Sequence, residues 1–345
     1  MDEGTRGVRT VDISKIAVIG AGSWGTALAN LLAGKGLEVD IWVREDEVFK
    51  QIRDERTNRV FLPGIRLASG LRPVVSFEEA LHGKQLVLLV VPSHVFREVL
   101  VAIRPYLRPE MSMMIATKGI ENDTLMIMSQ VAESVLPGQY MGNFACLSGP
   151  SFAKEVSREC PTAVTIGCPD IDHAERLQRL FYREFFRVYM TEDLIGLQLC
   201  GALKNVIAIG AGASDGLQFG HNARAALITR GLAEMTRLGV EMGADRHTFA
   251  GLAGMGDLVL TCTGDLSRNR MVGMSVGKGM SLEEIVGSMN MVAEGIKTTR
   301  SAYELAGKMG VVMPITMQVY QILYEGKDPR QAVRELMARD LKREG

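Results

Sequence analysis

A strand–turn–helix pattern near the start of the chain constrains the fold more than any other feature of the sequence. An apolar run over residues 16–19 ends abruptly at glycine, which is typical of a buried parallel strand. Gly20, Gly22 and Gly25 then form the pattern G-x-G-x-x-G, and a helix is expected over residues 26–32. The first glycine permits a tight turn, the second leaves room for a pyrophosphate, and the third lets the helix pack closely on the strand. The pattern favours a dinucleotide site over a glycine-rich turn without a ligand.

Composition and charge exclude several classes of protein. A chain of 345 residues is long enough for two domains, and its apolar fraction of 47% is ordinary for a soluble globular protein. The formal net charge of −1 gives no reason to expect nucleic acid or an acidic membrane surface as a partner. The five cysteines are scattered without a C-x-x-C pair, which argues against structural zinc and a disulfide framework. We therefore expect a cytoplasmic protein without a metal site, in which any anion site is local.

Strands and helices alternate from residue 15 to residue 193. After the first strand, the segments that read as strands are residues 38–43, 72–76, 85–91, 111–116, 144–147, 162–167 and 187–190. Helical spacing lies between them, as in residues 95–103 and 174–185. This alternation predicts an α/β fold with a Rossmann-like doubly wound sheet. We assign it to a dinucleotide-binding domain of residues 15–193, preceded by a tail of residues 1–14.

The pattern changes after residue 193, where no convincing strand follows, and we expect an all-α C-terminal domain over residues 194–345 for substrate binding and catalysis. The expected helices are residues 194–211, 222–238, 247–252, 268–277, 281–288, 298–308, 316–324 and 329–339. Asn222 suits an N-cap, Gly239 suits the residue past a helix end, and Ser281 with Glu284 forms a capping box. The apolar stretch 194–213 contains three polar side chains, so it reads as a buried helix rather than a membrane span.

Arg44 stands at the end of the second expected strand, where a Rossmann fold reads the adenosine ribose. An acidic residue there would bind the 2′-hydroxyl of NAD, whereas an arginine would accommodate the 2′-phosphate of NADP. Arg44 favours NADP, although Glu45 and Asp46 follow it. The alternative is that the three charges form a solvated strand end.

Lys204 is the leading candidate for acid–base chemistry. It lies among apolar residues at roughly helical spacing and near glycines that permit close packing. A lysine in such surroundings is desolvated, which lowers its pKa towards the range that suits a general acid. A lysine that extends its ammonium to the surface is an equally good interpretation of the spacing.

Lys118 and Asp257 are further candidates. Lys118 follows the strand over residues 111–116, at the sheet edge where ligands bind in open α/β folds, although a surface lysine is the commoner outcome. Asp257 lies in an expected glycine-rich turn, where the backbone can approach a ligand. It could bind a substrate hydroxyl or hold a lysine, and the alternative is an Asx-turn or a helix cap.

An expected helix begins with Ser267, Arg268, Asn269 and Arg270. Two arginines, hydroxyl groups and a helix N-terminus could together form a phosphate cradle. The alternative is a capped helix on the surface.

Eight motifs spread from residue 15 to about residue 330 carry a family resemblance. They are Gly20-Ala-Gly-Ser-Trp-Gly-Thr-Ala-Leu-Ala29, Ala116-Thr-Lys-Gly119, Leu147-Ser-Gly-Pro-Ser-Phe-Ala153, Gly201-Ala-Leu-Lys-Asn-Val206, Asn222-Ala-Arg-Ala-Ala-Leu-Ile-Thr-Arg-Gly-Leu232, Gly251-Leu-Ala-Gly-Met-Gly-Asp-Leu258, Leu266-Ser-Arg-Asn-Arg270 and Glu294-Gly295. Each motif is modest alone, but in this order they closely resemble the NAD(P)H-dependent glycerol-3-phosphate dehydrogenases of the bacterial type.

The resemblance implies an oxidoreductase that reduces dihydroxyacetone phosphate to sn-glycerol 3-phosphate with NADPH or NADH, for glycerophospholipid synthesis. It also implies a cytoplasmic homodimer. By this resemblance Lys204 is the proton donor in reduction and the acceptor in oxidation, with Lys118 and Asp257 beside it. Residues that resemble the family's substrate contacts are Lys118, Gly149, Ser151, Lys204, Asp257, Ser267, Arg268 and Asn269. Those that resemble its cofactor contacts are Ser23, Trp24, Arg44, Lys118, Ala153, Arg268, Val292 and Glu294, besides the three glycines.

Two other functions fit the same plan less well. A related enzyme acting on a hydroxyacid or on ketopantoate would need a carboxylate-binding pocket instead of a phosphate cradle. A non-catalytic redox sensor would bind the dinucleotide without needing Lys204 and Asp257, and would carry an output surface such as a basic DNA-reading helix. The sequence offers no such helix.

Overall fold

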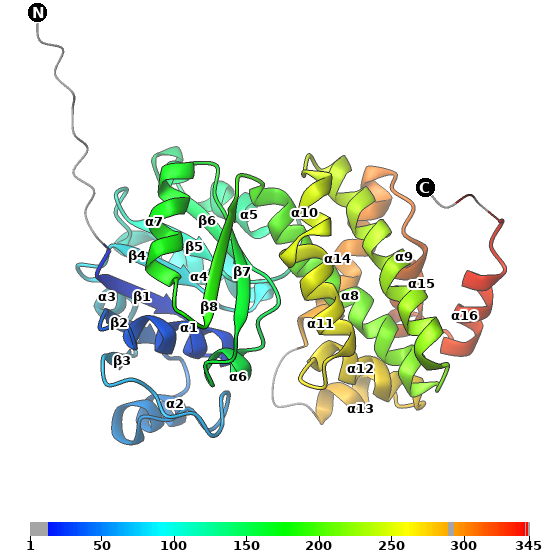
Figure 1. The fold of residues 1–345 in the computed structure, drawn as a ribbon, viewed down its shortest axis with the longest axis horizontal. Coiled ribbons are helices and arrows are strands. Elements are labelled where there is room, and N and C mark those ends of the chain that lie inside the picture. Colours follow the sequence, from blue (N-terminus) through cyan, green and yellow to red (C-terminus); the bar gives the residue numbers. More distant parts are fainter. Residues whose placement is uncertain (1–12, 289–292, 342, 344–345) are drawn as a thin grey trace, which may run out of the picture.

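Two halves of different architecture lie side by side in the computed structural model, which describes residues 13–288, 293–341 and 343. One half is a sheet with helices on its faces, and the other is a bundle of helices (Figure 1). Residues 1–12 of the expected tail, and Val292, lie outside the described residues.

The sheet has eight strands in the order β3-β2-β1-β4-β5-β6-β7-β8. The strands are β1 (Lys15–Ile19), β2 (Glu38–Trp42), β3 (Leu71–Val74), β4 (Leu86–Leu89), β5 (Ser112–Ile115), β6 (Phe144–Ser148), β7 (Thr162–Gly167) and β8 (Phe186–Thr191). Strands β1 to β6 are parallel, while β7 is antiparallel to β6 and parallel to β8. The strand order reverses between β1 and β4, and this point is where a doubly wound sheet binds its ligand. The predicted fold class is confirmed.

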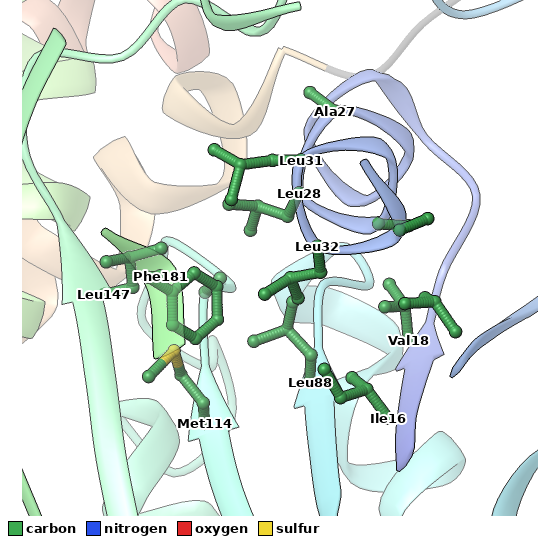
Figure 2. Close-up of a cluster of buried hydrophobic side chains, with 14 of the residues drawn as sticks. Ile16, Val18, Ala27, Leu28, Leu31, Leu32, Leu88, Met114, Leu147 and Phe181 are labelled. Carbon is green, nitrogen blue, oxygen red and sulfur yellow. The ribbon is translucent and has the colours of Figure 1, made fainter. Parts of the chain in front are cut away.

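Two layers of apolar side chains cover the two faces of the sheet. One face packs against α1 (Ser23–Ala33), α6 (Ala153–Val156) and α7 (Ile171–Phe181), together with α2 (Asp46–Lys50) near the edge. The other face packs against α3 (Phe77–Leu81), α4 (Phe96–Ile103) and α5 (Met128–Val135). Figure 2 shows Leu28 and Leu32 of α1 beside Ile16, Leu88 and Met114 of the strands. Strands buried on both faces explain why their sequences are near-continuous apolar runs.

No strand follows β8 among the described residues beyond position 191. The helices there are α8 (Leu194–Gly216), α9 (Gly220–Glu241), α10 (Arg246–Ala250), α11 (Asp257–Thr263), α12 (Arg268–Gly277), α13 (Leu282–Gly287), α14 (Glu294–Met309), α15 (Pro314–Tyr324) and α16 (Pro329–Met337). The central helix is α8, in which every residue from Gly196 to Ser214 is buried. By length and composition α8 could cross a membrane, but 89% of its most apolar window lies inside the protein, as the polar residues in its sequence predict.

Helices α8 and α12 approach each other closely enough for their backbones to touch. A methyl group added at Gly212 would lie 2.0 Å from the carbonyl oxygen of Arg270, and one added at Gly273 would lie 2.0 Å from that of Ile209. Only glycine leaves room for this contact, which fixes the start of α12 against the second half of α8.

Two expected boundaries of α9 are wrong. The helix begins at Gly220 rather than after an Asn222 cap, and no side chain in the described part of the chain caps its first turn. Gly239 lies inside the helix, not past its end, and a side chain there would meet the Phe249 ring at 2.1 Å. The glycine is therefore a packing residue. The capping box of Ser281 and Glu284 at the start of α13 is confirmed.

Glu234 of α9 caps another helix from inside the protein. Its carboxylate, 3% exposed, accepts hydrogen bonds from the backbone nitrogens of Ile315 (2.6 Å) and Thr316 (3.1 Å) in the first turn of α15. These nitrogens have no partner within their own helix, and the positive end of the helix dipole favours a carboxylate there. Burial nevertheless raises the pKa of Glu234 above its usual value, while these hydrogen bonds oppose the rise.

We expect Glu234→Gln to lower the free energy of unfolding by about 1–3 kcal/mol, because an amide nitrogen would face a backbone donor and leave it unsatisfied. Urea unfolding measures the change. The exposed Glu241→Gln on the same helix is the control and is expected to behave as wild type. An unchanged unfolding midpoint for Glu234→Gln would contradict the capping role.

Candidate active site

The glycine turn between β1 and α1 is shaped for the close approach of an anion. Gly20 has φ +120°, and a side chain at Gly25 would collide with the Gly20 carbonyl oxygen at 1.9 Å. The space above Gly22 is open for 4 Å. Within the described ranges, no side chain caps the first turn of α1, so its backbone nitrogens remain available to a pyrophosphate.

Ser23 and Trp24 are the first two residues of α1. The Trp24 indole nitrogen is buried and has no hydrogen-bond partner among the described residues. An orphaned buried donor beside an uncapped helix start fits a polar ligand, so the turn fits a dinucleotide.

Arg44 follows β2, with its side chain 73% exposed and its guanidinium 2.8 Å from the Glu45 carboxylate. Asp46 instead begins α2, where an acidic residue suits the helix dipole. An exposed ion pair between neighbouring residues is weak, so the guanidinium remains free to turn to a 2′-phosphate.

Three charged side chains meet inside the protein where the two halves touch. The Asp257 carboxylate, 1% exposed, lies 2.5 Å from the Lys204 ammonium and 3.0 Å from the Lys118 ammonium. Lys118 comes from the loop after β5, Lys204 from the middle of α8, and Asp257 from the first residue of α11. Lys204 is 6% exposed, so the buried interpretation of its spacing is the correct one.

Burial sets the protonation of this cluster, and pairing adjusts it. Burial lowers the pKa of Lys204 to about 7, although Asp257 opposes the change and Lys118 adds to it. Burial also acts to raise the pKa of Asp257, but the two lysines outweigh it and hold this carboxyl below its usual pKa. At neutral pH the cluster therefore contains a charged carboxylate and a lysine that can readily give or take a proton.

Asp257 does not lie in the expected glycine-rich turn. Residues Leu252–Gly256 form a single turn of π-helix that continues directly into α11. The Thr261 hydroxyl, one turn further on, donates to the Asp257 carbonyl at 2.6 Å. The same hydroxyl lies 3.3 Å from the Asp257 carboxylate, which holds both lysines.

The start of α12 supplies one free arginine rather than two. Arg268 is half-buried and has no ion-pair or hydrogen-bond partner among the described residues, and burial lowers the pKa of its guanidinium. Arg270 points elsewhere, to Asp215 at 2.8 Å, which corrects the expectation of a two-arginine cradle.

The two polar residues beside Arg268 are both used in hydrogen bonds within the protein. Ser267 caps the helix by accepting from the Arg270 backbone nitrogen. Asn269 donates to the Asn205 side chain (2.9 Å) and accepts from the Gly295 backbone nitrogen (2.9 Å).

The loop after β6 brings Gly149 and Ser151 to the same sheet edge, and the Ser151 hydroxyl donates to the Gly149 carbonyl at 2.9 Å. Ala153 begins α6, which packs against α1. The buried Ser148 hydroxyl has no hydrogen-bond partner among the residues that the structure describes. A side chain at Gly201 of α8 would meet this hydroxyl at 3.1 Å and Lys118 at 3.4 Å. This loop therefore lies beside the charged cluster.

Glu294, the first residue of α14, connects the helical half to the sheet edge. Its carboxylate accepts from the Ser93 hydroxyl at 2.5 Å, in the loop after β4. Burial raises the pKa of Glu294, with Ser93 and Arg268 acting against the rise.

Three residues that contact the predicted site residues are not among those expected from the sequence. They are Ser93, Asn205 and Thr261. Ser93 follows a predicted strand and Asn205 follows Lys204, so their positions in the sequence indicated that they lie near the site. Their residue types alone did not.

An uncapped glycine turn at the reversal point of a doubly wound sheet, next to a buried lysine–carboxylate–lysine cluster, defines a dinucleotide-dependent oxidoreductase. The profile for the N-terminus of NAD-dependent glycerol-3-phosphate dehydrogenase matches residues 15–174, and the profile for its C-terminus matches residues 193–334. The chain belongs to this family.

Individual relatives agree with the family profiles. The glycerol-3-phosphate dehydrogenase [NAD(P)+] of Geobacter metallireducens is 61% identical over 96% of this chain and 98% of its own length. The crystal structure of glycerol-3-phosphate dehydrogenase from Coxiella burnetii is 40% identical, with a TM-score of 0.90 over 95% of this chain and all of that one. A ketopantoate reductase from Ralstonia eutropha, 15% identical over 92% of this chain and 99% of its own, reaches a TM-score of 0.59 and shares the fold alone.

Proposed function

We propose that the chain reduces dihydroxyacetone phosphate to sn-glycerol 3-phosphate with NADPH or NADH, and that Lys204 transfers the proton. The observation that carries the proposal is the Lys204 ammonium, buried and 2.5 Å from Asp257 at the ligand edge of the sheet. The reduced nicotinamide supplies the hydride when it is bound. The protein must then stabilise the negative charge that develops on the carbonyl oxygen and protonate it.

Lys204 suits both tasks. As an ammonium it donates a hydrogen bond to the carbonyl oxygen and then gives up its proton, leaving a neutral amine in an apolar environment that tolerates it. Asp257 holds the ammonium in place, and Lys118 supplies further positive charge to the developing oxyanion. In oxidation the same lysine, as the amine, accepts the proton.

Arg268, with the capped start of α12, is proposed to bind the substrate phosphate, with Ser267 and Asn269 beside it. Gly149 and Ser151 complete the substrate site. Binding a phosphate away from the reacting carbon supplies energy for holding the carbonyl in place.

The cofactor is proposed to lie along the glycine turn, with its pyrophosphate at Ser23 and Trp24. Contacts further along it would come from Arg44, Lys118, Ala153, Arg268, Val292 and Glu294, of which Val292 lies outside the described residues.

The family resemblance supports three broader proposals. Residues 15–193 form the dinucleotide-binding domain and residues 194–345 the catalytic domain, with a short tail before them. The active form is a homodimer in the cytoplasm. Its product enters glycerophospholipid synthesis.

Lys204→Ala is expected to lower turnover of dihydroxyacetone phosphate by about 10²–10⁴-fold, because a positioned proton donor contributes that much. NADPH binding, followed by fluorescence, should stay close to wild type. Lys308→Ala, at an exposed lysine of α14, is the control and should turn over normally. Wild-type turnover by Lys204→Ala would remove the residue from the mechanism.

The pH dependence of kcat/KM should differ between the two directions. Reduction needs the Lys204 ammonium, so its kcat/KM should fall as the pH rises above about 7. Oxidation needs the neutral amine, so its kcat/KM should rise over the same interval. Initial rates across this interval test the signs, and a reduction rate that climbs through it would contradict the assignment.

Arg44→Ala is expected to raise the KM for NADPH by about tenfold, as a charge-assisted contact is lost, and to leave the KM for NADH unchanged. Arg53→Ala is a matched control, because Arg53 is also exposed and pairs with the next residue, Asp54, at 2.7 Å. Equal effects of Arg44→Ala on both cofactors would show that the arginine does not read the 2′-phosphate.

A further inference from the structure

Asp215, in the last turn of α8, holds two arginines from two other helices. Its carboxylate lies 2.8 Å from the Arg270 guanidinium at the start of α12 and 3.1 Å from that of Arg224 in α9. The three side chains are only 11% to 21% exposed. Removing one partner from such a network leaves a poorly solvated charge, so the carboxylate constrains both helices.

Arg270 is fixed to α8 through its backbone as well as its side chain. Its carbonyl oxygen lies where a side chain at Gly212 would be, one turn before Asp215. The first turn of α12 is therefore held against the end of α8 at two points. Arg268, two residues earlier, makes no hydrogen bond or close ion pair among the described residues, although the charge of Glu294 attracts it. Its position therefore follows that of this turn.

A second contact joins the same helices nearer the charged cluster. Asn269 donates to Asn205 at 2.9 Å, and these residues are the chain neighbours of Arg268 and Lys204. The helix that carries the proton donor is thus bonded directly to the helix that carries the free arginine. The pair α8–α12 fixes the separation between Lys204 and Arg268.

We propose that Asp215 is a positioning residue for the substrate: by holding Arg270 and Arg224, it sets the place of Arg268 relative to Lys204, and so of the phosphate relative to the carbonyl. The inference rests on the proposed function, in which Arg268 binds the phosphate and Lys204 serves the carbonyl. Asp215 itself touches neither group.

The role predicts an effect that depends on the substrate's phosphate. Asp215→Asn should lower kcat/KM for dihydroxyacetone phosphate by about 10–100-fold, mainly through a higher KM, because small misplacements of a binding group are costly. For dihydroxyacetone, which lacks the phosphate, kcat/KM should be unchanged. Both substrates are assayed at saturating NADPH, because Arg268 is also proposed to contact the cofactor. Asp215→Glu, which keeps the charge, should recover much of the loss.

If Asp215 only stabilised the fold, its substitution would not lower kcat/KM for dihydroxyacetone phosphate while leaving kcat/KM for dihydroxyacetone unchanged. Glu234→Gln is the matched control, since it also alters a buried carboxylate between helices and is expected to lower stability without changing the KM. If Asp215→Asn does not fold, Arg270→Lys tests the same contact from the other side. It keeps a positive charge but loses the fork that meets the carboxylate, and it should show the same dependence on phosphate.

The outcomes separate this role from the proposed function. A wild-type protein that does not reduce dihydroxyacetone phosphate overturns the proposed function. An active wild type together with an Asp215→Asn variant of unchanged KM overturns the positioning role alone. Equal losses of kcat/KM for the two substrates in that variant would also overturn it.

Discussion

A carboxylate buried between two lysine ammoniums is the interaction on which the rest of the structure depends. Moving an ion into the protein interior costs several kcal/mol unless a partner compensates for it. Asp257 offsets the cost of burying the ammonium groups of both Lys204 and Lys118. The cluster keeps a net positive charge when all three groups are ionised. That charge is useful only for a ligand that becomes negative beside it, as a carbonyl oxygen does on receiving hydride. The buried positive charge that is costly for folding is therefore the charge that the reduction of a carbonyl group needs.

Building this cluster requires the two halves of the chain to meet accurately. Lys118 belongs to the sheet half, while Lys204 and Asp257 belong to α8 and α11 of the helical half (Figure 1). Other polar contacts cross the same boundary, among them Ser93 with Glu294 at 2.5 Å and the backbone nitrogen of Ser129 with Gln198 at 2.9 Å. These contacts are directional, so they fix the relative orientation of the halves in a way that apolar packing alone does not.

Local patterns in the sequence were enough to predict the sheet. Strands buried on both faces must be apolar throughout, and a G-x-G-x-x-G pattern between a strand and a helix is compatible with few local structures. Local patterns could not decide whether Lys204 is buried or exposed, since that depends on the helices packed around α8, which include α11 and α12, more than fifty residues further along the chain. They could not separate Arg268 from Arg270 either. Arg270 is bound by Asp215, which lies 55 residues before it in sequence, and by the nearer Asp265, whereas Arg268 makes no close ion pair among the described residues. The π-helical turn before Asp257 and the packing of Gly239 on Phe249 are likewise set by tertiary contacts.

Direct titration of Lys204 tests the central claim, which is that burial beside Asp257 brings this lysine into the range of proton transfer. NMR of lysines labelled at the ε-carbon, assigned with Lys204→Arg, gives its pKa in the wild-type protein and in Asp257→Asn. We predict a midpoint of about 7 in the wild type. The midpoint should be lower in Asp257→Asn, because the carboxylate favours the ammonium form. A wild-type midpoint near the ordinary lysine value of 10.5, or one that Asp257→Asn leaves unchanged, would contradict the account.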